Sequence, residues 1–355
     1  MTKRAGSGGL SILAITSMRN EGPYCTEWIA HHLAAGFTDF LIYSNDCDDG
    51  TDAILSRLDR AGVITHVPFS PSGERSVQWQ VLRAARDHPA LARADWAMFL
   101  DCDEFLNLRP PHGGLTDVIA ALPQEAEAMA LRWRLFGNSG HMEAPDELTI
   151  RAFDHAAPPG IALPLAHFFK TLFRPGSFAK PGVHRPKARK GTTPVWVDGS
   201  GADLGQGFAK AEQRINLYGV PAASDLVQLN HYSVRSAQAF MNKRARGLPN
   251  HMDREIGLGY WVERNFNAVR DDSIASMVPR TQAALESLLK ISGLADDHAR
   301  AICAHRDRFD QMMTDRGNIQ LYWHLALASG SRPPELDFAR AQVGRIRAAG
   351  EQDGK

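Results

Sequence analysis

Short apolar segments alternate with amphipathic segments over the first hundred residues of the chain. The segments with the pattern of strands are residues 10–16, 40–43, 63–67 and 96–100. The segments with the spacing of helices are residues 24–35, 51–62 and 76–87. Strands that alternate with helices of this length predict a mostly parallel, doubly wound sheet with helices on both faces. We therefore expect an α/β fold.

The fourth expected strand runs directly into two carboxylates. Residues 96–100 are uniformly apolar, as in a strand buried on both faces, and Asp101 and Asp103 follow. If the strand geometry persists through the acids, the two side chains point to the same side. Adjacent carboxylates repel each other unless a cation neutralises them, and Mg²⁺ or Mn²⁺ suits such oxygen ligands. We prefer a metal site that binds phosphate over acids that cap a helix or pair with arginines.

Two more polar loops follow the first two expected strands. The first contains Arg19, Asn20 and Glu21, and the second runs from Asn45 through Asp46 and Asp48 to Asp49. Each could be an ordinary solvated turn. In open α/β sheets, however, ligands bind outside the carboxyl ends of the strands, where these loops would meet the acid pair. We therefore expect them to contact a base or a ribose.

The bulk composition limits the class of protein. The 355 residues contain 40 basic and 40 acidic side chains, which argues against a general nucleic-acid binder. The four cysteines show no zinc-site spacing, and no apolar stretch approaches the length that spans a membrane. We expect a reduced, cytoplasmic protein. We also expect an α/β domain over residues 1–235 and a mostly helical C-terminal extension over residues 236–355.

Histidine and basic residues in the second half are candidates for the same site. His231 follows an apolar run and could complete a metal site, and His184 competes for that role. Lys170 belongs to a basic group around His184 that could hold a diphosphate or an acidic acceptor. Residues 158–207 are rich in Gly, Pro and basic side chains, and we expect them to form a mobile lid.

Together these motifs resemble a nucleotide-sugar glycosyltransferase of the GT-A fold. The resemblance is closer to the bacterial family-2-like group of lipopolysaccharide-core or capsular glycosyltransferases, and it spans about residues 10–245. The matching pieces are Arg19–Glu21, Glu27–Trp28 with His31, Asn45–Thr51, Asp101–Leu106, Trp133 with Phe136–His141, Lys170 and Asn230–Tyr232. One departure is Cys47, where the family usually has a polar residue.

The resemblance implies an inverting transfer from a UDP-sugar or similar donor, with Mn²⁺ or Mg²⁺. It implies that Asp101 and Asp103, with His231, hold the metal on the donor diphosphate. It also implies that Asn20, Glu21, Asn45, Asp46, Asp48 and Lys170 contact the donor. The acceptor would be a glycan or a lipid-linked sugar in polysaccharide biosynthesis, no nucleic acid would bind, and peripheral association with a membrane stays open.

A hydroxyl acceptor needs a general base within hydrogen-bond reach. The candidates past the acid pair are His141, Glu143 and Asp154, and we rank Glu143 first because it follows the expected acceptor loop at residues 136–141.

Other classes of protein also fit parts of the pattern. A phosphatase or phosphotransferase with an Asp-x-Asp motif would use the first acid as a nucleophile. In that class the acids follow the first core strand, whereas here about three strands precede them. A nucleotidyltransferase would need a glycine-rich phosphate loop after residues 10–16, which this chain lacks. A non-catalytic sugar-binding module, with a structural cation between the acids, is the third alternative.

Overall fold

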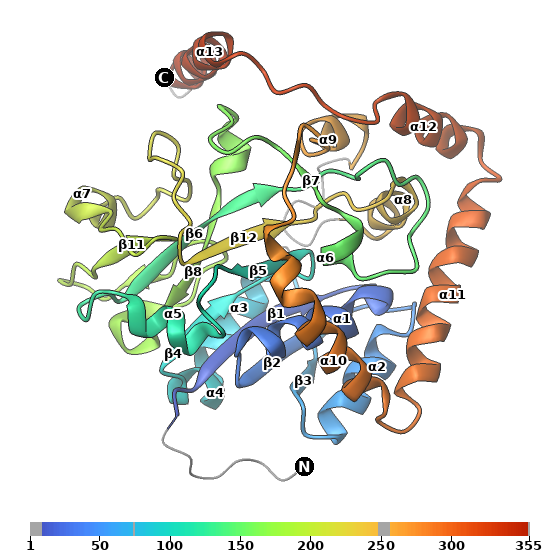
Figure 1. Ribbon diagram of the computed structural model, residues 1–355, viewed down its shortest axis with the longest axis horizontal. Helices are drawn as coiled ribbons and strands as arrows, with labels where there is room; N and C mark the ends of the chain where they lie inside the picture. The colour runs from blue at the N-terminus through green and yellow to red at the C-terminus, as the bar shows by residue number, and fades with distance from the viewer. Residues whose placement is uncertain (1–8, 74, 248–255, 354–355) are drawn as a thin grey trace.

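A nine-stranded mixed sheet forms the centre of the molecule (Figure 1). The structure is a computed structural model that describes residues 9–73, 75–247 and 256–353. In spatial order, eight of the strands are β3 (Thr65–Pro68), β2 (Asp39–Ser44), β1 (Ile12–Met18), β4 (Trp96–Phe99), β8 (Phe169–Phe173), β6 (Ala128–Leu135), β12 (Val227–His231) and β5 (Glu104–Leu108). The ninth strand, β11 (Trp196–Asp198), pairs with the start of β6. The first four strands in this order are parallel, so their carboxyl ends lie at one edge. The predicted α/β class with a mostly parallel sheet is confirmed.

Helices pack on both faces of the sheet. Successive residues of β1 point to opposite faces, so that Ile12 and Ala14 enter one apolar core and Leu13 and Ile15 enter the other. The first core is covered by α1 (Gly22–Ala35), α2 (Thr51–Arg60), α5 (Leu115–Ala121) and α10 (Val278–Leu289). The second core is covered by α3 (Val77–Asp87), α4 (Pro89–Arg93) and α7 (Gly205–Lys210). The prediction of a doubly wound arrangement is therefore confirmed for the N-terminal part of the sheet.

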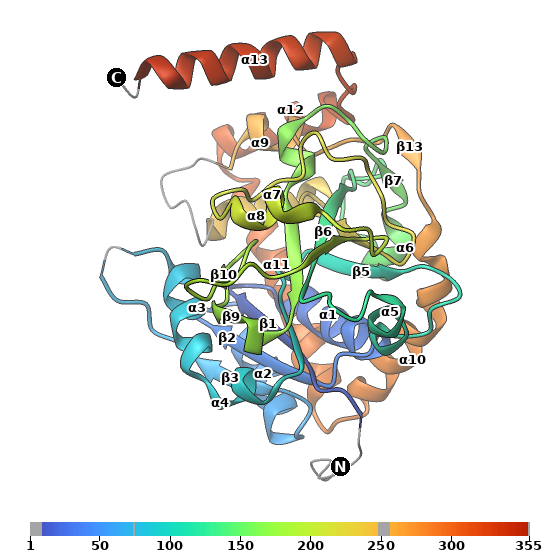
Figure 2. The ribbon, with the colours of Figure 1, turned by 90° about the vertical axis from the view of Figure 1, so that its left-hand side faces the viewer.

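The described chain after residue 236 is mostly helical, as expected. Its remaining helices are α8 (Ala237–Arg246), α9 (Leu258–Val262), α11 (Leu294–Met312), α12 (Arg316–Leu327) and α13 (Leu336–Asp353). Figure 2 shows α13 at the top of the molecule, on the far side of α12 from the sheet. Leu288 of α10 and Ala301 of α11 belong to the first apolar core of the sheet. The division into domains at residue 235 stays a prediction.

Short elements complete the described fold. The short helical elements are α6 (Thr149–Ala152), η1 (Pro164–His167), η2 (Pro175–Ser177) and η3 (Ser273–Met277). Two small sheets each contain two strands: β9 (Phe178–Lys180) pairs with β10 (Lys187–Ala188), and β7 (His155–Ala156) pairs with β13 (Val269–Arg270). Over the described ranges, no helix combines the length and the apolar composition needed to cross a membrane.

The segment expected to be a mobile lid contains part of the central sheet. Within residues 158–207, strand β8 lies between β4 and β6 and is antiparallel to both. All five of its residues are buried. The prediction of a lid is therefore wrong for this strand, because Phe169, Leu172 and Phe173 pack in the cores of the sheet.

Helix α1 connects the first strand to the acid-bearing segment. Pro23 lies in its first turn, where a missing N–H costs nothing, and Gly36 ends it with a positive φ of 101°. The Trp28 side chain is fully buried, and its indole N–H donates to the Glu104 carbonyl oxygen over 3.0 Å. This hydrogen bond joins α1 to the strand that follows the acid pair.

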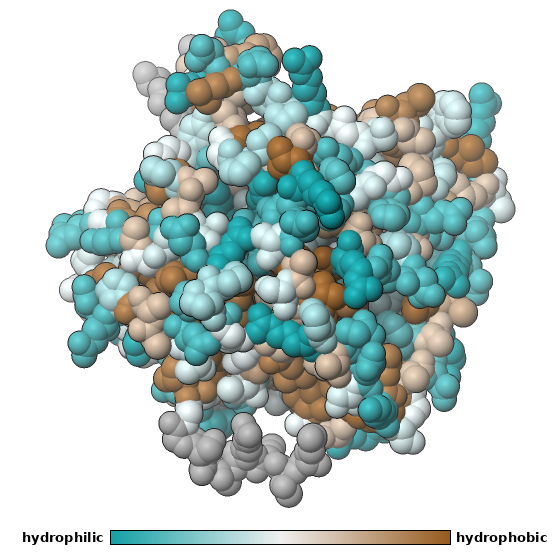
Figure 3. All heavy atoms as spheres, viewed as in Figure 1, coloured by the Kyte–Doolittle hydropathy of each residue, from teal (hydrophilic) through white to brown (hydrophobic). Residues whose placement is uncertain are grey.

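The surface seen in Figure 3 is mixed. Hydrophilic residues prevail over the middle of this face, and apolar residues form separate patches between them.

We predict that Trp28→Phe lowers the free energy of unfolding by about 2 kcal/mol, because it removes a buried hydrogen bond and leaves a cavity. The matched control is Trp79→Phe, since the Trp79 side chain is 39% exposed and should tolerate the change within about 0.5 kcal/mol. Urea denaturation of the two variants measures the difference. Equal losses would contradict the assigned role of Trp28.

Candidate active site

Three loops meet at the carboxyl edge of the parallel strands. Strands β1, β2 and β4 end at Met18, Ser44 and Phe99, and a polar loop follows each. The Asn20 side-chain oxygen accepts a hydrogen bond from the Asp48 N–H over 2.9 Å, which joins the first loop to the second. Asn20 and Asp46 have positive φ values of 52° and 47°, a conformation that Asn and Asp tolerate better than most residues. The predicted convergence of the first two loops is therefore present.

A cleft of about 410 Å³ opens beside these loops. Six of the predicted site residues line it: Glu21, Asn45, Asp46, Asp101, Asp103 and His231. Its other walls include Trp133, His184, Lys243 and Arg246. One cavity thus brings together side chains from both halves of the chain.

The two acids bind different lysines. The Asp101 carboxylate accepts hydrogen bonds from the Lys170 ammonium over 2.9 Å and from the Gln78 amide over 3.1 Å. The Asp103 carboxylate lies 2.8 Å from the Lys243 ammonium and 3.5 Å from Nε2 of His231. Burial alone would raise the pKa of Asp103, but the Lys243 and His231 side chains hold it well below its usual range.

The expected strand geometry through the acids is wrong. Strand β4 ends at Phe99, and a turn places the Glu104 N–H 3.0 Å from the Asp101 carbonyl oxygen before β5 begins. The acids therefore lie on a turn between two strands. The turn lets Asp101 reach Lys170 on β8 while Asp103 reaches Lys243 on α8.

A third acid lies behind the pair. The Glu104 side chain is fully buried, and its carboxylate accepts hydrogen bonds from the Trp133 indole over 2.6 Å and the Asp101 N–H over 2.8 Å. The ammonium of fully buried Lys170 lies 3.4 Å from it. Burial raises the pKa of Glu104, and the nearby Lys170 charge opposes that shift. Lys170 therefore bridges Asp101 and Glu104, and it does not itself line the cleft.

The predicted nucleotide-binding residues differ in what they already contact. The Glu21 carboxylate pairs with the guanidinium groups of Arg246 and Arg235. Asp48 pairs with Arg308 and, like Asn20, does not line the cleft. Asn45 and Asp46 line the cleft and are hydrogen-bonded to each other. The geometry thus favours Asn45 and Asp46 as direct contacts of a nucleotide.

The side chains of Asp101, Asp103 and His231 offer ligand atoms of the kinds that bind a hard divalent ion. Carboxylate oxygens and an imidazole nitrogen are ordinary ligands of Mn²⁺. Nδ1 of His231 is buried and has no hydrogen-bond partner within the described residues. However, both acids already pair with a lysine, and the described part of the chain gathers no group of three His, Cys, Asp or Glu side chains suited to a metal. The metal role of Asp101, Asp103 and His231 stays a prediction.

The three candidates for the general base lie outside the cleft. Nε2 of His141 is 3.1 Å from the Ala152 carbonyl oxygen, and Asp154 pairs with His155 and Arg270. Glu143 is exposed. The loop that carries them ends beside helix α8, where Gln238 accepts a hydrogen bond from the Ala144 N–H. Their catalytic role stays a prediction that this geometry does not support.

The sequence analysis did not predict that basic residues of helix α8 line the cleft. Lys243 and Arg246 lie in the last turn of α8, and each pairs with an acid of the strand-end loops. Basic residues at the end of a helix usually face solvent and complement the helix dipole. The local pattern therefore gave no signal that these two point into a binding site.

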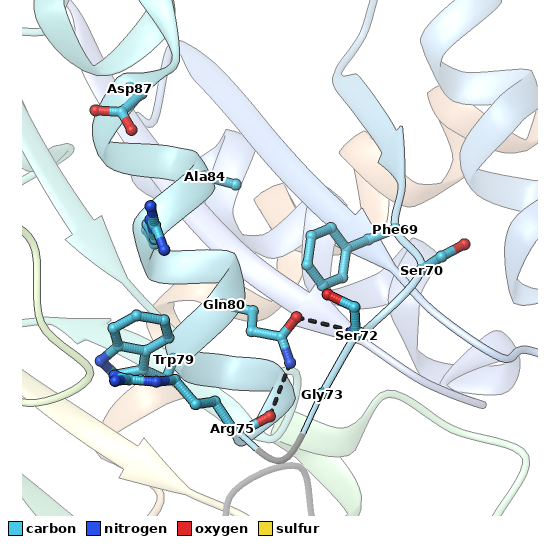
Figure 4. Close-up of a pocket in the computed structure, with 10 residues that line it drawn as sticks. Phe69, Ser70, Ser72, Gly73, Arg75, Trp79, Gln80, Ala84 and Asp87 are labelled. Atoms are coloured by element: carbon cyan, nitrogen blue, oxygen red, sulfur yellow. Dashed lines mark hydrogen bonds between the residues drawn. The ribbon is translucent and has the colours of Figure 1, made fainter.

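A second, shallower depression adjoins the cleft. It has a volume of about 720 Å³ and shares Gly73 and Arg75 with the cleft. Figure 4 shows how Gln80 of α3 holds its loop, with hydrogen bonds to the Ser72 N–H and the Arg75 carbonyl oxygen. The Arg75 guanidinium lies 4.1 Å from the ring centre of Trp79. This surface therefore continues the cleft on the side of α3.

Comparison with known proteins supports a glycosyltransferase. Residues 23–198, just under half of the chain, match the sequence model of glycosyltransferase family 92. A glycosyltransferase family 92 protein of Oryza sativa subsp. japonica is 31% identical over 140 residues, which cover 38% of this chain and 23% of that protein. One of Ricinus communis is 28% identical over 158 residues, which cover 41% of this chain and 26% of that protein. The matched region thus spans about a quarter of the length of these relatives.

One similar solved structure is a mannosyltransferase from Pyrobaculum calidifontis in complex with GDP-Man and Mn²⁺. It is 13% identical, with a TM-score of 0.36, and the comparison covers 89% of this chain and 87% of that one. The family named by the sequence match is family 92, whereas the motifs alone suggested a family-2-like group.

We predict that Lys243→Met lowers the free energy of unfolding by about 3–5 kcal/mol at neutral pH, because it leaves the buried Asp103 carboxylate without its cation. Lys243 lowers the pKa of Asp103 in the folded protein. The pair therefore stabilises the fold above about pH 4, the ordinary range of an aspartate, and this contribution is lost as the pH falls through the lowered value.

Urea denaturation at two pH values measures this effect. The control is the double variant Asp103→Asn with Lys243→Met, which removes both charges and should recover part of the loss. A single variant as stable as the unmodified protein at neutral pH would contradict the pairing.

Proposed function

We propose that this chain transfers a sugar from a nucleotide-sugar donor to a hydroxyl group of a glycan or lipid-linked acceptor. The observation that carries the proposal is the meeting of three strand-end loops at one cleft, because two of these loops lie inside the segment that matches glycosyltransferase family 92 and the third directly precedes it. Ligands of open α/β sheets bind at this edge. The donor would be a UDP-sugar, the transfer would be inverting, and polysaccharide biosynthesis of the lipopolysaccharide-core or capsular type would be its setting.

Different side chains of the cleft would contact different parts of the nucleotide-sugar donor. Asn45 and Asp46 would contact the nucleoside, since both lie at the end of β2 and line the cleft. Lys243 and Arg246 would lie beside the diphosphate and stabilise the charge that develops as it leaves. Both cations are held in place by acids, namely Asp103 and Glu21.

A divalent ion held by Asp101, Asp103 and His231 would supply further positive charge to the leaving diphosphate as a Lewis acid. Lys243, which lies 2.8 Å from the Asp103 carboxylate, would supply a second positive charge beside the diphosphate. The chain itself restricts the orientation of His231, whose ring lies against Trp133 with 4.3 Å between the ring centres and an angle of 43° between the ring planes.

The experiment is incubation with UDP-, GDP-, CDP- and dTDP-sugars, with Mn²⁺ or with a chelator. We expect release of the nucleoside diphosphate from one donor class, and we expect Asp103→Ala to abolish it while circular dichroism shows an intact fold. A fully active Asp103→Ala protein would contradict the assignment of the acid pair. Phosphate release from a simple monoester would favour a phosphatase, and no turnover with any donor would favour a sugar-binding module.

Glu143→Gln is the matched control for this experiment. Loss of a general base lowers turnover by about 10²–10⁴-fold. Because Glu143 is exposed and outside the cleft, we expect its neutral variant to keep nearly full activity. A large loss of turnover in Glu143→Gln would instead support the sequence-based prediction that it is the base.

A further inference from the structure

A third cavity, distinct from the cleft and from the depression at Trp79, has a volume of about 280 Å³. It is lined by residues of α1, α8, α10 and α11 and by the loop that precedes α6 (Figure 1). It shares no lining residue with the cleft. Its volume is near the lower end of the range for small-molecule sites. A much smaller pocket lies between the two, lined by Glu21 and Lys243 of the cleft and by Arg235 and Asn242 of this cavity, so the two are distinct but adjacent.

Three buried polar residues of this cavity each have an atom without a hydrogen-bond partner in the described chain. The atoms are Oε1 of Glu27, Oδ1 of Asn242 and Nδ1 of His305, and these residues are only 7%, 4% and 8% exposed. Buried polar atoms are almost always hydrogen-bonded in proteins. Their gathering around one cavity therefore points to a polar ligand.

The neighbouring contacts fix the hydrogen-bonding role of Asn242 and show which atom of the other two residues is left over. The Asn242 amide nitrogen donates to two carbonyl oxygens, which leaves Oδ1 to accept. Nε2 of His305 lies 2.7 Å from the Asp49 carboxylate and donates to it, which leaves Nδ1 as the ring nitrogen without a partner in the described chain. Oε2 of Glu27 accepts from the Thr149 hydroxyl over 2.8 Å, and Oε1 is left over. Nε of Arg235 adds one unpartnered donor to the same cavity.

The charges around the cavity limit the ligand. Arg235 and Arg306 line the cavity, and so do Glu27, Asp146 and Glu147, so neither sign of charge prevails there. A charged ligand of either sign would lose its hydration without a clear counter-charge. Pro23, Phe153 and Leu285 supply apolar surface against which a ring can pack. A neutral molecule with several hydroxyl groups satisfies all of these conditions.

We propose that this cavity is a second carbohydrate site, which binds a neutral sugar unit apart from the donor cleft. Sugar hydroxyls, which can both donate and accept, would donate to Asn242, accept from Arg235 and hydrogen-bond to Glu27 and His305. This inference is independent of the proposed transfer, because it concerns binding and not turnover.

Arg235 connects the second site to the cleft. It is a non-glycine residue with a positive φ of 49°, which is strained for a long side chain. Its guanidinium lies 3.8 Å from the ring centre of Tyr24, donates to the Cys102 carbonyl oxygen over 2.9 Å, and lies 3.6 Å from the Glu21 carboxylate. A sugar that contacts Arg235 would therefore touch the residue that supports the turn of the acid pair.

The test is saturation-transfer NMR of the full chain with millimolar glucose, galactose and mannose, each alone, and with protonated glucosamine for comparison. We expect a neutral sugar to bind, and glucosamine to bind more weakly. Leu285→Trp should weaken binding about tenfold or more by filling the cavity, and Glu27→Gln should weaken it by altering one acceptor. The cleft variant Asp103→Asn should bind the sugar as the unmodified protein does.

The outcomes separate the two sites. Absence of binding by all three neutral sugars to the folded protein would overturn the proposal. So would binding that is lost in Asp103→Asn but retained in Leu285→Trp, because the sugar would then lie in the cleft. Equal or tighter binding of glucosamine would overturn the neutral class of ligand. If Leu285→Trp does not fold, weaker sugar binding by Glu27→Gln is the test instead, because Gln preserves the shape of the Glu side chain.

Discussion

Charge compensation at the carboxyl edge of the sheet is the interaction on which the site depends. Asp101, Asp103 and Glu104 lie within four residues, and two of them are almost fully buried. Carboxylates in such a place are stable only when cations and hydrogen-bond donors surround them. Lys170 from β8 and Lys243 from α8 supply the cations. The acid pair thus fixes one strand and one helix that are distant in the sequence.

The parallel part of the fold could be predicted from the sequence because its signals are local. The apolar runs of β1, β2 and β4 and the turn at Gly36 are each visible in a short window. Strands β5 and β8 could not be predicted in this way. They contain buried Glu104 and Lys170, and these charges interrupt the apolar pattern although they neutralise each other in the fold.

The site was predictable where it depends on strand ends, and not where it depends on tertiary packing. The loops at Asn45 and Asp101 follow predicted strands, so their place at the sheet edge follows from topology alone. Lys243 and Arg246 reach the cleft from α8, which packs against α11 and α12 through Phe240 and Met241. Glu143 was expected near the site because it follows a glycine-rich loop, but the loop ends beside α8, outside the cleft.

The most direct test of the account is a crystal structure of the full chain with UDP and Mn²⁺. The account predicts the diphosphate within hydrogen-bond distance of Lys243 or Arg246, the metal beside Asp103, and the nucleoside next to Asn45 and Asp46. A nucleotide bound elsewhere on the protein, with the Asp103–Lys243 pair intact and the cleft filled by solvent, would contradict it.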